Sequence, residues 1–243
     1  MRTLTYSRSL AFTVLWGMWT ALFGPLIPLL WMAGTPPKAV RALTRLWARG
    51  ILALLSAVVG LRYERMGEGN VPATPSLIVV NHESTWETLA ALVLFPNVAI
   101  IAKRELMRIP VMGWYLRRSP MILIDRDDAA KALREMLGQS RLALATGRSV
   151  LIFPEGSRKR VGEEIAFKRG VELLYRSLDV PVVPVVVDSG RFWGIDGGSK
   201  KSGTIKVSIL SPISPGMKAA EFVREAQSRM QAERARVSLS QAA

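Results

Sequence analysis

Cysteine is absent from the 243-residue chain, and histidine occurs only once. The absence of cysteine excludes a disulfide framework, thiol catalysis and cysteine-ligated zinc. The single histidine excludes histidine-cluster metal sites and restricts any histidine-based catalysis to His82. The first 60 residues contain six basic residues and no acidic one, and the first acid is Glu64. Residues 1–60 are therefore a compositional unit distinct from residues 61–243.

The chain is both basic and hydrophobic, with a net charge of +14, 49% apolar residues and a mean hydropathy of +0.22. This apolar content is too high for a disordered basic tail. The combination favours an anionic membrane surface or a phosphorylated substrate as partner. Nucleic acid is the weaker alternative, because the aromatic residues gather in the amino-terminal segment and do not alternate with basic ones.

A 24-residue apolar stretch runs from Leu10 to Ala33. About 20 apolar residues are enough to cross a bilayer, while Pro25 and Pro28 predict a bend or a re-entrant path. A cleaved signal peptide is disfavoured, because the stretch is long and no clear cleavage site follows it. A buried pair of core helices is the other alternative.

A basic helical pattern follows the apolar stretch. Arg41, Arg45 and Arg49 recur every four residues and therefore share one face of a helix. Apolar residues fill the other positions, which is typical of a helix that lies in the membrane interface. We expect residues 1–60 to form a membrane-associated helical segment, with spanning and monotopic attachment both open.

Short β-rich runs alternate with helical patterns after Gly60. The runs expected as strands are 76–81, 97–102, 121–124, 149–153, 180–187 and 204–210. The segments expected as helices are 85–94, 127–145, 165–178 and 218–236. This alternation predicts a layered α/β domain over 61–243 with a largely parallel sheet. The prolines in 180–187 predict imperfect pairing, and the Gly/Ser/Lys-rich segment 197–203 predicts a flexible surface loop.

His82 directly follows the first of these strands and precedes a helix. A neutral imidazole there is a plausible general base, provided that a carboxylate fixes its tautomer and offsets its charge. Glu87 supplies that carboxylate only if His82 lies in the loop and Glu87 in the first helical turn, because residues five apart do not share a helix face. The alternative for Glu87 is a capping box with Ser84, which merely closes the start of the helix.

A second polar segment, Phe153-Pro154-Glu155-Gly156-Ser157-Arg158, also follows a strand. Its glycine allows close backbone approach, and Arg158 can contact a phosphate with two hydrogen bonds. Lys103 and Arg126 follow two further strands, and the carboxyl ends of parallel strands meet at one edge of a sheet. We therefore expect an anion-binding rim there, against the alternative of ordinary solvated basic turns.

Other common chemistries leave no signature in the chain. Ser84 and Ser157 are conceivable nucleophiles, but no G-x-S-x-G elbow surrounds either of them. A P-loop and a G-x-G-x-x-G fingerprint are also absent from the sequence, which disfavours an NTPase or a dinucleotide enzyme.

Four blocks in order make the chain resemble the 1-acylglycerol-3-phosphate acyltransferase family of membrane lysophospholipid acyltransferases. The blocks are Asn81-His82-x4-Glu87; Gly113 through Ile122-Leu123-Ile124-Asp125-Arg126, with Lys103-Arg104-Glu105-Leu106 upstream; Phe153 through Arg158, with Phe167-Lys168-Arg169-Gly170; and Val180 through Val185. The resemblance covers about 77–187. The chain departs from the family pattern at Glu87, where most members carry Asp, at Ser157, where Thr is usual, and at Ser119-Pro120, where Gly is common.

The resemblance implies acyl transfer from an acyl thioester to the free sn-2 hydroxyl of 1-acylglycerol-3-phosphate, giving phosphatidic acid. His82 would be the general base and Glu87 its partner. Lys103, Arg126 and Arg158 would hold the acceptor's phosphate, and Glu155, Gly156 and Ser157 would shape the same site.

The resemblance further implies no metal and no bound cofactor, and it makes nucleic acid an unexpected partner. The donor would be an acyl-carrier protein or coenzyme A thioester. The location would be the cell inner membrane, with the catalytic domain facing the cytoplasm. The open alternatives are another acceptor such as glycerol 3-phosphate or a different lyso-lipid, a hydrolase that uses the same dyad with water, and a non-catalytic protein that binds anionic membranes.

Overall fold

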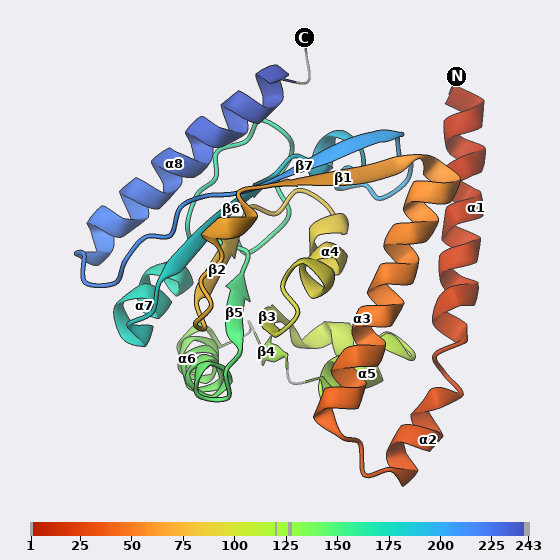
Figure 1. Ribbon diagram of the computed structural model, residues 1–243, viewed down its shortest axis with the longest axis horizontal. Helices are drawn as coiled ribbons and strands as arrows, with labels where there is room; N and C mark the ends of the chain where they lie inside the picture. Colours follow the sequence, from red (N-terminus) through yellow and green to blue (C-terminus); the bar gives the residue numbers. More distant parts are fainter. Residues whose placement is uncertain (1, 120, 126–127, 241–243) are drawn as a thin grey trace.

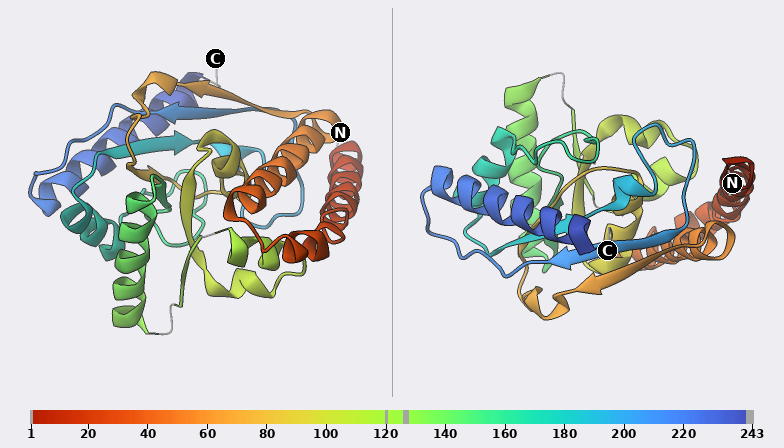
Figure 2. Two further views of the ribbon diagram at one scale, coloured as in Figure 1. Left: turned by 60° about the horizontal axis from the view of Figure 1, so that its bottom comes forward. Right: turned by 90° about the horizontal axis from the view of Figure 1, so that it is seen from above.

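The computed structural model describes residues 2–119, 121–125 and 128–240. Seven strands form one sheet in the order β1-β7-β6-β2-β5-β3-β4, with helices packed on both faces (Figures 1 and 2). The strands are β1 (Leu61–Met66), β2 (Leu77–Val80), β3 (Val98–Lys103), β4 (Ile122–Ile124), β5 (Ser149–Ile152), β6 (Val182–Val187) and β7 (Gly203–Ile209).

The α-helices are α1 (Arg2–Ala21), α2 (Leu26–Met32), α3 (Pro37–Leu54), α4 (Trp86–Leu94), α5 (Met112–Arg118), α6 (Ala129–Ala145), α7 (Arg169–Leu178) and α8 (Ala219–Ser240). A π-helical turn, η1 (Leu55–Val59), continues α3. Short 3₁₀ turns are η2 (Glu68–Asn70), η3 (Arg104–Arg108) and η4 (Ser189–Arg191). The predicted helices and strands after residue 70 are all present, although the expected helix over 165–178 begins only at Arg169.

The sheet is largely parallel, as the sequence predicts. Among the seven strands of the described residues, β6 and β7 pair antiparallel and every other neighbouring pair is parallel. Pro184 lies inside the sheet, where it faces Val79 of β2. On the other side of β6 the ladder with β7 covers 185–187 and resumes as a separate bridge between Val182 and Ile213. The proline thus lies where this ladder is interrupted, in accordance with the expected imperfect pairing.

Side chains that alternate along the strands divide the core into two layers. Ile78 and Val80 face one side of the sheet and pack with α1, α3, α4 and α5. Leu77 and Val79 face the other side and pack with α6, α7 and α8. This period of two in fully buried strands gives a helix–sheet–helix sandwich. Figure 1 shows α6, α7 and α8 on the one side and α1 and α3 on the other.

The amino-terminal apolar stretch is a bent pair of helices. The break between α1 and α2 falls at 22–25, just before and at Pro25, so the predicted bend is confirmed. Leu4–Met32 and Pro37–Val59 are both long and apolar enough to cross a membrane. Side chains of α1 and α2 are also unusually exposed for apolar residues. They include Leu4, Tyr6, Leu10, Val14, Met18, Leu22, Leu29, Trp31 and Met32.

Two parts of the structure differ from the sequence-based expectation. The strand β1, which was not predicted, follows Gly60 and pairs with β7 along the edge of the sheet. The segment 197–203, predicted to be a flexible surface loop, instead contains Lys200, which is buried. The Lys200 ammonium donates to the carbonyls of Gly197 and Gly198 and lies 4.9 Å from the centroid of the Trp193 ring. Desolvation of this lysine is offset by those carbonyls and by the aromatic face.

Candidate active site

The polar residues singled out in the sequence gather at one edge of the sheet. His82 follows β2 and Glu155 follows β5, so both lie at the carboxyl ends of neighbouring strands. Lys103 ends β3, the next strand beyond β5. In open α/β sheets this edge is where ligands bind. These residues predicted for the site therefore lie along one edge of the sheet, near the His82 loop.

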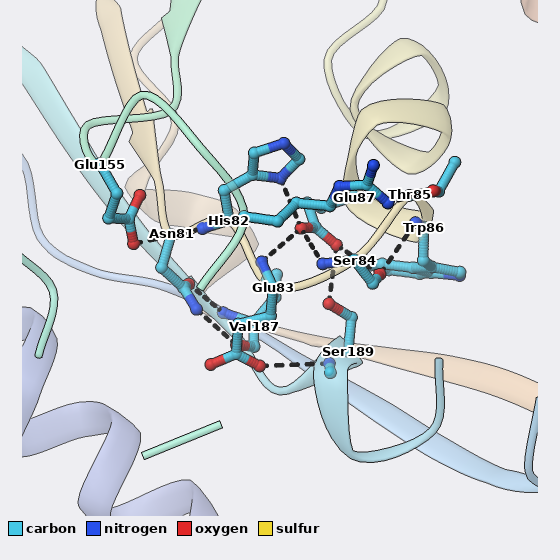
Figure 3. Close-up of polar contacts among 12 residues, drawn as sticks. Asn81, His82, Glu83, Ser84, Thr85, Trp86, Glu87, Glu155, Val187 and Ser189 are labelled. Atoms are coloured by element: carbon cyan, nitrogen blue, oxygen red, sulfur yellow. Dashed lines mark hydrogen bonds and ion pairs between the residues drawn. The ribbon is translucent and has the colours of Figure 1, made fainter. Parts of the chain in front are cut away.

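The Glu87 carboxylate contacts the His82 ring at its Nδ1 atom. The Nδ1 atom of His82 lies 2.7 Å from Oε1 of Glu87, so a carboxylate acceptor here places the Nδ1 proton on the imidazole and leaves Nε2 free as a base. The ring is stacked on Phe153, with centroids 4.1 Å apart, and its side chain is 17% exposed. Figure 3 shows the far side of the ring clear of the other labelled side chains. Glu87 and Phe153 therefore fix the orientation of the imidazole, and its remaining side is open to solvent.

Glu87 also fixes the turn that precedes its own helix. Its Oε1 accepts from the backbone N–H groups of Glu83 and Ser84, each at 2.6 Å. Its Oε2 accepts from the Ser84 hydroxyl at 2.8 Å. The carboxylate that contacts His82 thus also makes one of the two capping-box contacts posed as the alternative, that with the Ser84 N–H, whereas the Ser84 hydroxyl accepts from the Trp86 N–H. Because α4 begins at Trp86, the first turn carries Glu87 while His82 remains in the loop, which is the arrangement that the dyad requires.

The loop after β6 supplies further donors to the same carboxylates. The Ser189 hydroxyl donates to Glu87 Oε2 at 2.7 Å, and the Gly190 N–H donates to Glu83 Oε2 at 3.2 Å. Asn81 exchanges two hydrogen bonds with the backbone of Val187. A Cβ atom on Gly190 would lie 2.9 Å from the Cβ of Glu83, so only glycine permits this approach. The His82 loop is therefore fixed to the end of β6 at three successive points (Figure 3).

Three buried carboxyl groups near His82 have pKa values that diverge. Burial, reinforced by the neighbouring Glu87 charge, raises the pKa of Glu83 to about 7. Burial also raises the pKa of Glu155 to about 8. Burial alone would raise the pKa of Glu87, but hydrogen bonds and the charge interaction with His82, together with Ser84 and Ser189, hold it below its ordinary value. Near pH 7 Glu87 is thus the carboxylate that keeps a full charge, as a partner for an imidazolium requires.

The segment after β5 closes over the His82 loop. Glu155 is buried, and its Oε1 accepts from the His82 backbone N–H at 3.3 Å. Gly156 has a φ of 69°, a left-handed conformation that favours glycine. The turn reverses the chain, and the Lys159 N–H donates to the His82 carbonyl at 2.7 Å. Arg158 then lies beside α4, where its guanidinium donates to the Thr85 hydroxyl at 3.2 Å.

The structure thus brings together five of the residues predicted for the site. They are His82, Glu87, Glu155, Gly156 and Arg158. Ser157 is in the same turn but is exposed to solvent, and Lys103 is exposed at the end of β3. Arg126, also predicted to bind substrate, lies outside the described residues. Within the described residues no group of three or more His, Asp or Glu side chains is placed to hold a metal ion.

Sequence reasoning missed Ser189, Gly190 and the side chain of Glu83. All three form hydrogen bonds that support the His82 loop and Glu87. A signal for them exists, since Asp188-Ser189-Gly190 is a polar turn directly after the strand predicted over 180–187. That position puts the turn at the same edge as His82. Its specific partners depend on strand order, which the sequence alone does not give.

Comparison with known proteins places this site in a family. Residues 62–188 match the family described as Acyltransferase. A Pseudomonas aeruginosa protein named 1-acyl-sn-glycerol-3-phosphate acyltransferase is 35% identical over 194 residues, which cover 80% of this chain and 73% of the relative. The chain belongs to the acyltransferase family. The resemblance inferred from the four sequence blocks is thereby confirmed, and the protein is an acyltransferase enzyme.

Two further similarities extend this assignment. A Helicobacter pylori protein of the same name is 30% identical, with coverage of 73% of this enzyme and 75% of the relative. The crystal structure of the 1-acyl-sn-glycerophosphate (LPA) acyltransferase PlsC from Thermotoga maritima superimposes with a TM-score of 0.79 over 98% of both chains, at 21% identity. The fold similarity includes the amino-terminal helices as well as the sheet, and it confirms the predicted α/β architecture.

Proposed function

We propose that this enzyme transfers a fatty acyl group from an acyl thioester to the sn-2 hydroxyl of 1-acylglycerol-3-phosphate, giving phosphatidic acid for phospholipid synthesis. The observation that carries the proposal is the His82–Glu87 pair at 2.7 Å, beside an exposed arginine. The His82–Glu87 pair is suited to removing a proton from a hydroxyl, and the arginine is suited to binding a phosphate. The names of the relatives in Pseudomonas aeruginosa and Helicobacter pylori support the same acceptor.

In the proposed reaction, His82 Nε2 takes the proton of the acceptor hydroxyl. The oxygen attacks the thioester carbonyl carbon, the tetrahedral intermediate collapses, and the carbon–sulfur bond breaks. The departing thiolate receives the proton from the imidazolium. Glu87 offsets the positive charge while it exists, and it needs no rearrangement to do so because its donors already fix it. General base catalysis of this kind contributes on the order of 10²–10⁴-fold.

Arg158 is proposed to bind the acceptor's phosphate. Its guanidinium is held at one edge by Thr85, which leaves further N–H groups for a pair of phosphate oxygens. Lys103, at the end of β3, is proposed as a secondary contact, and so is Arg126, which lies outside the described residues. Glu155, Gly156 and Ser157 form the turn that presents Arg158. The donor is proposed to be an acyl-carrier protein or coenzyme A thioester, both of which are anionic and suit a basic rim.

The amino-terminal helices are proposed to attach the enzyme to the membrane from one side. Their exposed apolar side chains lie on α1 and α2, yet α1 also packs on Trp193 through Phe12 and Trp16. The helix α3 packs along α4. Full insertion of these helices across a bilayer would draw the polar domain in with them, which is costly. We propose the inner membrane with the site on the cytoplasmic side, to be tested by fractionation and protease accessibility in intact spheroplasts.

The experiment that tests the proposed reaction is mass spectrometry of lipids after incubation of the purified full-length enzyme. The acceptors are lysophosphatidic acid, glycerol 3-phosphate and lysophosphatidylcholine, each with acyl-carrier protein and coenzyme A thioesters. We expect phosphatidic acid with lysophosphatidic acid, and no product with the His82→Ala variant. Release of free fatty acid without a diacyl product would instead identify a hydrolase. Product from another acceptor alone would overturn the proposed substrate but not the acyl transfer.

A further inference from the structure

A second basic site lies at the opposite edge of the sheet from His82. A hollow of about 370 Å³ is lined by Lys38, Arg41, Arg45 and Arg148, together with Asn97 and Thr146. Asn97 directly precedes β3 and Arg148 directly precedes β5, so the hollow lies at the amino ends of strands whose carboxyl ends face the active site. Strands of this length separate the two edges by roughly 15–20 Å. The hollow is therefore distinct from the acceptor site beside Arg158.

Four cations converge on the hollow, and none of the described residues that line it is acidic. Arg148 is 6% exposed, and its guanidinium donates to the Val98 carbonyl at 2.9 Å. Arg45 donates to the Pro96 carbonyl, while its Nε is buried and makes no hydrogen bond to a described residue. Each arginine thus donates to a backbone carbonyl, which orients its guanidinium group beside the hollow.

The local electrostatics are unfavourable in the absence of an anion. Burial, followed by the nearby Arg41 charge, lowers the pKa of Arg148 to about 10. Lys38 and Arg41 lie in the first turns of α3, which contain no acidic residue. The positive end of the helix dipole favours negative charge at that position, so both basic residues have the wrong sign for the helix alone. A bound anion would relieve the repulsion and satisfy the dipole together.

We propose that this hollow binds a phosphate group. Its volume lies at the lower end of the range of about 300–1,000 Å³ that is common for small-ligand sites, and guanidinium pairs suit phosphate oxygens. The phosphate could come from an anionic phospholipid headgroup or from a soluble phosphate compound. The connection from α2 to α3 lies beside the hollow, and exposed Trp31 and Met32 precede it. Figure 1 shows this connection at one end of the molecule. In a membrane-attached enzyme that connection would bring the hollow to headgroup level.

The test compares Lys38→Gln/Arg41→Gln with Arg49→Gln/Arg62→Gln in the full-length enzyme. Both pairs remove two positive charges; Arg49 and Arg62 are exposed and lie outside the hollow. Inorganic pyrophosphate is titrated calorimetrically into detergent-solubilised protein at constant ionic strength. Sedimentation with phosphatidylcholine vesicles, with and without phosphatidylglycerol, provides the lipid arm. The Arg158→Gln variant separates this hollow from the acceptor site, because pyrophosphate bound in the hollow should persist in it.

We expect at least a tenfold loss of affinity in the Lys38→Gln/Arg41→Gln variant and less than a threefold change in the control pair. Loss in the pyrophosphate arm identifies a site that soluble phosphates can occupy, and loss confined to anionic vesicles identifies a headgroup site; either supports the proposal. Equal affinities for the two double variants in both arms would overturn it. Acyl transfer in neutral micelles should be unchanged in both, so that the result is independent of the proposed reaction.

Discussion

The Nδ1 atom of His82 and the Oε1 atom of Glu87 are 2.7 Å apart, although the two residues are five positions apart in the chain. The contact exists because the chain turns between them, with His82 in the loop and Glu87 in the first turn of α4. The Glu87 carboxylate accepts from two further backbone N–H groups and from the Ser84 and Ser189 hydroxyls. Such a group is fixed before substrate arrives, so its charge is available to the imidazolium at no further cost of reorganisation.

The first prediction concerns the charge of Glu87. A Glu87→Gln variant keeps the side-chain volume but loses the charge that stabilises a protonated His82. We expect kcat for acyl transfer to lysophosphatidic acid to fall on the order of 10²–10⁴-fold. The amide N–H groups would also face the N–H and O–H donors that Glu87 accepts from, which can destabilise the fold. Thermal unfolding followed by circular dichroism therefore measures how much of the variant is folded. A folded Glu87→Gln enzyme with the kcat of the unaltered protein would exclude the proposed role.

The sequence was sufficient to predict the contact between His82 and Glu87 because local geometry determines it. A strand end, a capping signal and a five-residue spacing leave one arrangement in which both residues can meet. Ser189 was not predictable in the same way. Its contact with Glu87 spans 102 positions and depends on β6 lying next to β2, and no local signal specifies this neighbour.

The fold was predictable for a similar reason where the strands are buried on both faces. Continuous apolar runs such as 77–80, whose strand pairs parallel on both sides, are typical of interior parallel strands. The edge strand β1 has an alternating polar pattern, with Arg62, Glu64 and Arg65 among its six residues, and was missed. Lys200 was missed because its burial depends on tertiary partners from α1 and from the turn after β6, whereas the local Gly/Ser composition predicted an exposed loop.

The second prediction concerns Arg158. Replacement by alanine should raise the KM for lysophosphatidic acid by about tenfold or more while kcat changes by less than about threefold, because a contact to the phosphate is made equally in the ground and transition states. Arg160→Ala is the matched control, since Arg160 is also exposed and lies two positions further along the same segment. Steady-state kinetics with varied acceptor decides the outcome. Equal KM values for the two variants would remove Arg158 from the phosphate site.

The third prediction concerns Glu155 and pH. Its folded-state pKa of about 8 lies above the ordinary value of 4.5, so the folded protein binds a proton that the unfolded chain releases. The stabilisation that the protonated Glu155 contributes is therefore fully present below about pH 4.5 and is lost as the pH rises through about 8. Glu155→Gln keeps the acceptor for the His82 N–H but removes the ionisation. We expect it to raise the free energy of unfolding by a few kcal/mol at about pH 9, on the order set by the shift, with little change at about pH 5.

Chemical denaturation across this pH range measures the effect. The neighbouring Glu83, with a pKa raised to about 7, follows the same sign and remains in the variant, so some pH dependence persists. Glu155→Ala serves as the contrasting variant, because it also removes the acceptor for the His82 N–H and should lower kcat. Parallel stability curves for Glu155→Gln and the unaltered enzyme over pH 5–9 would contradict the assigned ionisation.

The fourth prediction concerns the contact between α1 and α3. The Trp19 ring covers Gly50 so closely that a Cβ atom there would lie 2.3 Å from the ring. The Trp19 indole N–H donates to the Trp47 carbonyl at 3.0 Å. A Gly50→Ala variant must displace Trp19 and weaken that bond, at a cost of roughly 1–3 kcal/mol. For a chain of this size each kcal/mol corresponds to about 2–4 °C in Tm, so Gly50→Ala should melt several degrees below a Gly→Ala variant that lacks this contact.

Gly17→Ala in α1 is the matched control for this prediction, because among the described residues no atom beyond the neighbouring helix backbone lies within 4 Å of a Cβ at Gly17. Alanine is favoured over glycine within a helix by about 1 kcal/mol, so Tm should stay the same or rise. The two substitutions are chemically identical and both lie within helices, which leaves the Trp19 contact as the difference between them. Differential scanning calorimetry of both variants in the same detergent measures it. If Gly50→Ala melts no lower than Gly17→Ala, α1 does not depend on this contact to pack against α3.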